Sequence, residues 1–268
     1  MSFEEFTEAE LTGWDLRAAH YRDTTARATT QAIPAVLAAA RVAAGRRLID
    51  VCCGPGYAAG AAAALGADAK GVDAAPAMVA AAREAFPACR FDLADATALP
   101  ALDGALDAAV CSFGLFHLAD PAAALAEMNR VLASGGRLAA SHWAAPPASP
   151  FFRVVFGALG AHADMSVAPA GPPPFGLSSP DALAAALAEA GFDEISVSEV
   201  PIHFESPAEA FPEFFRAFAV RGSMILERQT PEIRARIEAD WRDGFASFVE
   251  DGVMRVPMPA LVASGAKP

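Results

Sequence analysis

Between residues 46 and 142, short apolar segments alternate with alanine-rich segments of helical periodicity. This alternation is typical of repeated βα units, which build a parallel sheet with helices on its faces. The pattern predicts strands near 46–52, 69–73, 89–93, 105–112 and 136–142, and helices near 57–66, 76–86 and 120–133.

The regions on either side of this pattern add helices before it and a mixed segment after it. Residues 3–44 have a helical pattern, with a capping box at Thr7 to Glu10 and an alanine-rich helix from Gln31 to Ala44. The later elements are a proline-bracketed, phenylalanine-rich segment over 144–176, a helix from Ser178 to Ala190, a strand near 194–204, helices over 206–250 and a last strand near 253–264.

These elements predict a single α/β domain, 1–268, in which helices over 1–44 precede a core over 45–143. Two segments, 144–176 and 205–252, interrupt the repeating pattern, so we expect insertions that fold together as a helical lid over the functional edge of the sheet. In the second insertion, phenylalanines at helical spacing predict a core of its own. These are Phe211, Phe214, Phe215 and Phe218.

A glycine turn and two carboxylates follow consecutive strands. The apolar strand ending at Asp50 leads through Cys52-Cys-Gly54-Pro-Gly56 into a helix, and such a turn brings backbone N–H groups to a helix N-terminus. Asp73 and Asp95 each end a later strand, about twenty residues apart. Because the carboxyl ends of parallel strands line one edge, these groups should share a crevice. A ribose diol and an exocyclic amine suit the two carboxylates, so we expect a nucleoside-bearing cofactor.

Composition and charge narrow the class of protein. Apolar residues make up 54% of the chain, but no apolar run reaches the roughly 18 residues of a membrane span, and the acidic N-terminus does not resemble a signal peptide. The cysteine count, 4, is too low for a disulfide framework. We therefore expect a cytoplasmic protein with no membrane partner. The net charge of −12 and the absence of a basic cluster argue against nucleic acid.

The glycine turn by itself also matches the G-x-G-x-x-G/A dinucleotide fingerprint, as Gly54-Pro-Gly56-Tyr-Ala-Ala59. A short-chain dehydrogenase would pair a tyrosine with a lysine four residues later. Here Tyr21 and Tyr57 are followed at that distance by Thr25 and Ala61, so that chemistry is absent. Dehydrogenases that use histidine or a metal stay open as an alternative.

The ordered motifs resemble those of class I S-adenosylmethionine-dependent methyltransferases, particularly the ubiquinone/menaquinone-biosynthesis-like, small-molecule branch. The resemblance is close over about 45–142 and looser beyond, and it depends on the order and spacing of four clusters. They are Asp50-Val-Cys-Cys-Gly-Pro-Gly56, Gly71-Val-Asp73-Ala-Ala-Pro-Ala-Met78, Asp95-Ala-Thr-Ala-Leu-Pro100, and Asp107 to His117 with Asn129-Arg-Val-Leu132 and Gly135-Gly-Arg-Leu138.

The resemblance implies a Rossmann-like, doubly wound sheet of seven mostly parallel strands with an antiparallel last strand. It implies S-adenosyl-L-methionine as cofactor, with its ribose at Asp73, its adenine amino group at Asp95 and its methionine part over the glycine loop. Tyr21 resembles residues that close over the methionine carboxylate. The cofactor-binding positions implied are Tyr21, Asp50, Cys52, Gly54, Gly56, Asp73, Ala74, Met78, Asp95, Ala96 and Ser112.

The cysteines mark one departure from the family pattern. The family usually has glycine at the position of Cys52, and a cysteine leaves the backbone unchanged there only if its φ is negative. Adjacent Cys52 and Cys53 cannot easily bind one tetrahedral ion, and Cys89 and Cys111 lack metal-ligand spacing. We therefore expect small strand-end side chains and no metal.

Two histidines follow strands at the expected functional edge, His117 after the fourth and His142 at the end of the fifth. Either could orient or deprotonate an acceptor. The sequence thus predicts methyl transfer by in-line displacement to a small, apolar or aromatic acceptor, as O- or C-methylation. A nicotinamide-dependent oxidoreductase and a non-catalytic S-adenosylmethionine-binding protein on the same fold are the alternatives. The alanine-rich faces are compatible with a homodimer.

Overall fold

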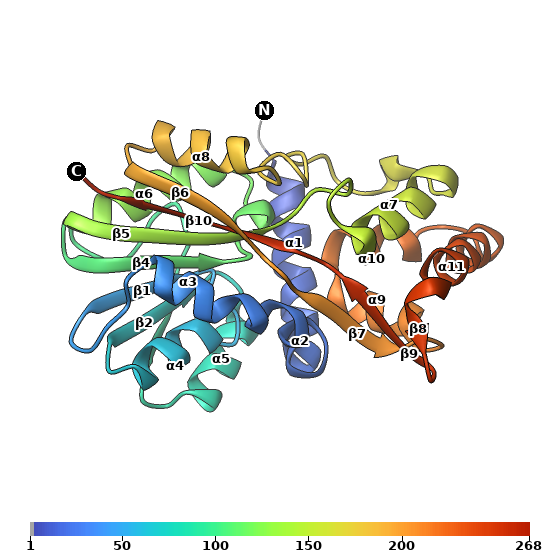
Figure 1. Ribbon diagram of the computed structural model, residues 1–268, viewed down its shortest axis with the longest axis horizontal. Coiled ribbons are helices and arrows are strands. Elements are labelled where there is room, and N and C mark those ends of the chain that lie inside the picture. Colours follow the sequence, from blue (N-terminus) through green and yellow to red (C-terminus); the bar gives the residue numbers. More distant parts are fainter. Residues whose placement is uncertain (1–2) are drawn as a thin grey trace.

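A central seven-stranded sheet organises the computed structural model, which describes residues 3–268 (Figure 1). The strand order is β3-β2-β1-β4-β5-β10-β6, and β10 is antiparallel to both of its neighbours. The other pairings in the sheet are parallel, so the expected fold class is confirmed. The strands are β1 Arg47–Val51, β2 Asp68–Asp73, β3 Arg90–Leu93, β4 Leu106–Ser112, β5 Leu132–Trp143, β6 Asp193–Val200 and β10 Ala260–Ala266.

Helices cover both faces of this sheet because successive strand side chains point in opposite directions. In β1, Leu48 packs with the helices of one face and Ile49 with those of the other, and both are fully buried. The helices of the first face are α3 Ile33–Ala39, α4 Tyr57–Ala64 and α5 Pro76–Ala85; those of the second are α6 Pro121–Val131 and α8 Pro180–Glu189.

The turn from β1 to α4 requires glycine at its last position. Gly56 has a φ of +82°, and a Cβ placed there would lie 2.6 Å from the ring of Phe91. Both the left-handed conformation and this close approach exclude a larger residue. The turn therefore keeps its backbone tight against the strand ends.

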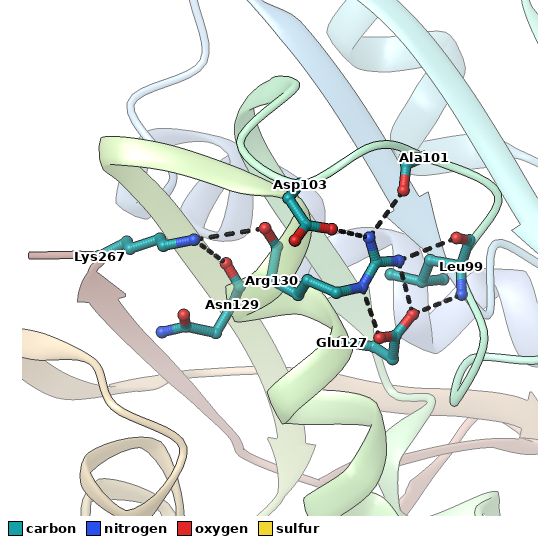
Figure 2. A network of polar contacts seen from close by, with 7 residues as sticks. All are labelled: Leu99, Ala101, Asp103, Glu127, Asn129, Arg130 and Lys267. Carbon is teal, nitrogen blue, oxygen red and sulfur yellow. Dashed lines mark hydrogen bonds and ion pairs between the residues drawn. The ribbon is translucent and has the colours of Figure 1, made fainter.

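An arginine on α6 holds the loop that connects β3 to β4. Arg130 donates to the carbonyl oxygens of Leu99 and Ala101 and pairs with Asp103, while Glu127 pairs with Arg130 and accepts from the Leu99 amide (Figure 2). Because Asp95 lies at the start of this loop, the Arg130 network fixes the path of the chain that leaves the functional edge.

The structure contains a second sheet that the sequence analysis did not predict. Its order is β7-β9-β8, antiparallel throughout. The strands expected near 194–204 and 253–264 are each split between the two sheets, because Pro201 and Pro259 lie at the crossings and lack the N–H of a ladder residue. The strands are β7 His203–Pro207, β8 Val249–Glu250 and β9 Val253–Pro257.

The phenylalanine-rich segments pack together beside this small sheet (Figure 1). Phe151, which is fully buried, contacts rings from the second segment, with centroids 6.0 Å from Phe211 and 5.9 Å from Phe245. The expected phenylalanine stripe lies in this cluster, where Phe211, Phe215 and Phe218 are buried. The helices are α7 Pro150–His162, α9 Phe211–Phe218, α10 Val220–Glu227 and α11 Pro231–Phe245.

The N-terminal helices differ in their limits from the expected ones. Helix α1, Glu4–Arg17, begins before Thr7, so the expected capping box lies inside the helix. The helix expected to end at Ala44 stops at Ala39. Between these helices the chain forms a 3-10 segment over Ala18–Asp23 and α2, Thr25–Thr29. Helix α1 lies between the large sheet and the helices of the phenylalanine-rich segments, where it contacts α10 (Figure 1).

Candidate active site

A cavity of about 700 Å³ lies at the carboxyl ends of the parallel strands, between the large sheet and the aromatic segments. It contains most of the positions that the sequence pointed to. The predicted residues that line it are Tyr21, Cys52, Gly54, Asp73, Ala74, Met78, Asp95, Ala96, Ser112, His117 and His142. Asp50 and Gly56 do not line the cavity. Asp50 instead accepts from the Ala59 amide in the helix that follows the glycine loop, and Gly56 packs closely against Phe91.

Asp73, at the end of β2, ties the glycine loop to the strand edge. Its Oδ2 accepts from the Gly54 amide at 2.8 Å and its Oδ1 from the Ala75 amide at 2.9 Å. Burial raises the pKa of Asp73, and these two amides oppose the rise. Each oxygen keeps a second lone pair, so a diol in the cavity could donate to this carboxylate.

Asp95 presents a second carboxylate from the next strand end. Its Oδ1 accepts from the amide and the hydroxyl of Thr97, both at 2.8 Å, in a local turn. The side chain is exposed to the cavity, and within residues 3–268 its Oδ2 has no hydrogen-bond partner. Asp95 therefore caps a local turn with one oxygen and keeps the other as a free acceptor that suits an exocyclic amine.

Asp50 supports the loop and does not contact the cavity. It is 1% exposed, and its Oδ2 accepts from the Ala59 amide at 3.0 Å in the first turn of α4. Its Oδ1 has no partner within the described part of the chain. Burial, with the nearby charge of Asp73, raises the pKa of Asp50 to about 7.

Cys52 has a left-handed backbone, with a φ of +56°. A cysteine would leave the backbone unchanged here only with a negative φ. The positive φ of Cys52 does not meet that condition. The thiol of Cys111 beside it, together with burial, raises the pKa of Cys52 well above its usual range, so the thiol stays protonated. No three histidine, cysteine or acidic side chains gather as a metal site among residues 3–268.

We expect the change Cys52→Gly to raise the melting temperature by about 2–3 °C. Relief of the left-handed strain contributes about 1–2 kcal/mol, part of which is offset by the greater freedom of glycine in the unfolded chain. Calorimetry of the purified variant measures the effect. Cys53→Gly is the matched control, because Cys53 is buried and has no positive φ, so this change should lower the melting temperature. A lower melting temperature for Cys52→Gly than for the wild type would show that the left-handed backbone at Cys52 does not destabilise the protein.

Tyr21 covers the glycine loop from the N-terminal segment. Its ring lies 3.9 Å from the position of a Cβ on Gly54, and its hydroxyl is 3.4 Å from the Thr29 hydroxyl. The ring stacks with Tyr57 at a centroid distance of 6.3 Å. Burial raises the pKa of Tyr21 to about 12, so the phenol stays neutral and acts as a hydrogen-bonding cover.

His142 is a neutral imidazole with one free nitrogen. Its Nδ1 lies 2.9 Å from the Trp143 carbonyl oxygen and 3.1 Å from the Ser178 hydroxyl. A carbonyl can only accept, so Nδ1 carries the hydrogen and Nε2 a lone pair. Nε2 is buried with no partner in the described residues, and burial lowers the pKa of His142 to about 4. His142 lines the cavity, but its unpartnered Nε2 has almost no exposed surface, so this nitrogen is not open to a molecule in the cavity.

His117 is held by residues from two distant elements. Its Nδ1 lies 2.8 Å from Oε2 of Glu10 on α1, and its ring packs edge-on against Trp14 of the same helix, with centroids 4.9 Å apart. The sequence analysis missed Glu10 and Trp14, because no motif relates them to a histidine more than a hundred residues away.

Aromatic side chains form the rest of the wall and come from every part of the chain. Phe113 stacks on Trp143 with centroids 3.9 Å apart, and Phe152 packs edge-on against the same indole. Phe215 and Phe218, which were expected in the core of the second insertion, also reach this cavity. The rings that enclose the cavity include Trp14, Phe113, Phe116, Trp143, Phe152 and Phe218.

Comparisons with known proteins agree with this geometry. A methyltransferase domain family matches residues 49–140. Demethylmenaquinone methyltransferase of Beutenbergia cavernae is 38% identical over 107 residues, which are 40% of this chain and 45% of that protein. The Thermus thermophilus enzyme of the same name is 46% identical over 100 residues, 35% of this chain and 46% of its own length. The chain thus spans about half the length of these curated relatives.

A solved structure extends the likeness of fold beyond the core. A putative methyltransferase from Bacillus halodurans superposes with a TM-score of 0.60 at 20% identity, over 88% of this chain and 98% of that one. Together with the glycine loop and the two carboxylates at the strand ends, these matches show a methyltransferase domain over residues 49–140 that is similar to the demethylmenaquinone methyltransferases.

Proposed function

We propose that this protein transfers a methyl group from S-adenosylmethionine to a small, neutral, apolar or aromatic acceptor that carries a hydroxyl group. The observation that carries this proposal is one aromatic-walled cavity that holds the carboxylates of Asp73 and Asp95 together with the imidazoles of His117 and His142. O-methylation, or C-methylation beside a phenolic oxygen, fits these groups.

The residues present fit the cofactor. Asp73 would hold the ribose hydroxyls, Asp95 the adenine amino group and the Gly54 loop the methionine part under Tyr21, with Met78 and Ala96 buried beside the adenine side. When bound, the cofactor supplies a methyl group already activated by its sulfonium. The chain therefore has to hold donor and acceptor in line and exclude water, and such positioning contributes on the order of 7–11 kcal/mol.

The charge of the cavity favours a neutral acceptor. Its lining has the carboxylates of Glu10, Asp73, Asp95 and Asp120, while its one arginine or lysine among residues 3–268 is Arg221, which donates to the Pro172 carbonyl. A phosphorylated acceptor would meet mostly negative charge. Apolar rings would instead replace water against the aromatic wall.

The proposal assigns separate roles to the two histidines. His142, neutral because its pKa is lowered to about 4 and with its Nε2 enclosed by protein, would form part of the wall beside the acceptor. A base with so low a pKa takes a proton poorly near neutral pH. His117, paired with a carboxylate, would take the acceptor proton. Residues 45–143 would form the cofactor-binding core, with 144–176 and 205–252 as the lid.

We expect S-adenosylmethionine and S-adenosylhomocysteine to raise the melting temperature, and NAD(H) to leave it unchanged. Ligand at 100 times its Kd adds about 2.7 kcal/mol, which is about 5–10 °C for a chain of this size. A thermal-shift titration with the three compounds measures this. A shift with NAD(H) alone would favour the nicotinamide alternative.

A second step tests turnover. The protein is incubated with methyl-labelled S-adenosylmethionine and a panel of phenols, naphthols, reduced quinones and phosphorylated alcohols. We expect label in hydroxyaromatic products and none in phosphorylated ones. Tight cofactor binding with no turnover across the panel would favour a non-catalytic cofactor-binding protein.

A further inference from the structure

We propose that Glu10 is a positioning residue for His117, holding the hydrogen on Nδ1 so that Nε2 can take the proton of the acceptor. This inference rests on the proposed function. The contact that motivates it joins Glu10 Oε2 and His117 Nδ1 at 2.8 Å, across 107 residues of sequence.

The Glu10 carboxylate is buried and is paired with His117. Its side chain is 7% exposed, and within residues 3–268 its one hydrogen-bond partner is His117. Burying a carboxylate costs several kcal/mol unless a partner compensates it, so a helix designed only for packing would carry an apolar residue here. An ionised carboxylate can only accept, which places the hydrogen on Nδ1.

The other nitrogen of His117 is free to react. Nε2 makes no hydrogen bond within the described chain, and it is not among the buried unpartnered atoms, so it can be reached from the cavity that His117 lines. Trp14 and Phe116 fix the plane of the ring, with centroids at 4.9 and 4.2 Å. The arrangement presents an oriented lone pair to the site.

Helix α1 is docked firmly enough to hold this geometry. Asp15 Oδ1 accepts from the Ala77 amide at 2.8 Å, at the start of α5 and close to Asp73. On another side, Gly13 packs against Val220 of α10 so closely that an added Cβ would lie 2.3 Å from a valine methyl. Helix α1 therefore contacts both α5, beside the expected cofactor edge, and α10, in the expected lid (Figure 1).

In the proposed reaction, the hydroxyl proton of the acceptor moves to His117 as the methyl group is transferred. While the acceptor oxygen forms its bond to the methyl carbon, the carbon–sulfur bond breaks and its electron pair stays on sulfur. The hydroxyl proton passes to Nε2, and the imidazolium that forms is paired with the Glu10 carboxylate. Later loss of this proton to water restores the neutral imidazole.

The decisive experiment is nitrogen NMR of 15N-histidine-labelled protein at alkaline pH, with His117→Ala used to assign the signals. In the wild type, we expect His117 to carry its hydrogen on Nδ1. In Glu10→Ala we expect the hydrogen to move to Nε2 in a large fraction of molecules. Glu10→Gln, whose amide oxygen can still accept, should restore the Nδ1 form. Glu8→Gln, on the exposed side of the same helix, should change nothing.

Activity supplies a second reading with the acceptor that turns over in the panel. Both Glu10 variants should lose kcat by about 100-fold at nearly unchanged KM, because neither has a charge to stabilise the imidazolium. Their affinity for S-adenosylhomocysteine should stay within about threefold. A wild-type His117 with its hydrogen on Nε2, or a tautomer that does not respond to Glu10→Ala, would overturn the proposal. The NMR result needs no cofactor or acceptor, so it stands apart from a failure of the proposed function.

Discussion

Replacing Asp73 by asparagine is expected to weaken the binding of S-adenosylhomocysteine by about 100-fold. Both carboxylate oxygens already accept a backbone amide, so the ribose hydroxyls would bind through the remaining lone pairs. Hydrogen bonds to a charged group contribute about 1.5–3 kcal/mol each, and the asparagine amide nitrogen cannot accept at all. Isothermal titration calorimetry measures the affinity. The titration is done at pH 8, because burial raises the pKa of Asp73 and the wild type must be ionised.

The matched control is Asp68→Asn. Asp68 begins the same strand, lies at its opposite end and is exposed, so this variant removes the same charge far from the cavity. Its affinity should equal that of the wild type. The melting temperature of the Asp73 variant without ligand shows whether the Gly54 loop is still in place. An unchanged affinity in a folded Asp73 variant would contradict the cofactor assignment.

The functional edge could be predicted because it follows from local pattern and one rule of topology. Short apolar runs identified the parallel strands, and the carboxyl ends of such strands meet at one edge. Asp73 and Asp95 lie there for this reason, although they follow different strands and are well separated in the sequence. The prolines at 201 and 259, by contrast, did not show that two continuous apolar runs cross between sheets, because a proline also fits an edge or a strand end.

Glu10 and the backbone of Cys52 could not be predicted in the same way. Glu10 belongs to the first helix, whose buried positions depend on contacts with α5 and α10, and nothing in the neighbouring sequence distinguishes Glu10 from Glu8. The φ of Cys52 is imposed by the tight turn between β1 and α4, where the loop has to follow the strand edge. In both cases a long-range constraint overrides the local preference of the residue.

Replacing Asp50 by asparagine is expected to stabilise the protein without ligand at pH 8 by about 4 kcal/mol relative to the wild type. The ordinary pKa of 3.8 describes the unfolded chain, whereas burial raises the folded value to about 7. The folded state therefore holds a proton that the unfolded state releases between these values. The contribution of Asp50 to the free energy of unfolding is greatest below pH 3.8. It falls by about 1.4 kcal/mol per pH unit up to pH 7 and is constant at higher pH. Asparagine keeps an acceptor for the Ala59 amide and has no charge to bury.

Thermal unfolding from pH 5 to pH 8 tests this, with Asp107→Asn as a control of opposite sign. The Arg47 pair lowers the pKa of Asp107 to about 2, so the Asp107 stabilisation is complete throughout that range and its loss should lower the midpoint equally at every pH. For Asp50→Asn the gain over the wild type should instead grow between pH 5 and pH 7 and then stay constant, reaching about 8–16 °C. A gain that does not depend on pH would mean that Asp50 is ionised in the folded protein, with its second oxygen satisfied. Since Asp50 anchors the first turn of α4 behind the glycine loop, the shape of this curve shows whether the protein without ligand holds the loop with a neutral or a charged carboxyl group.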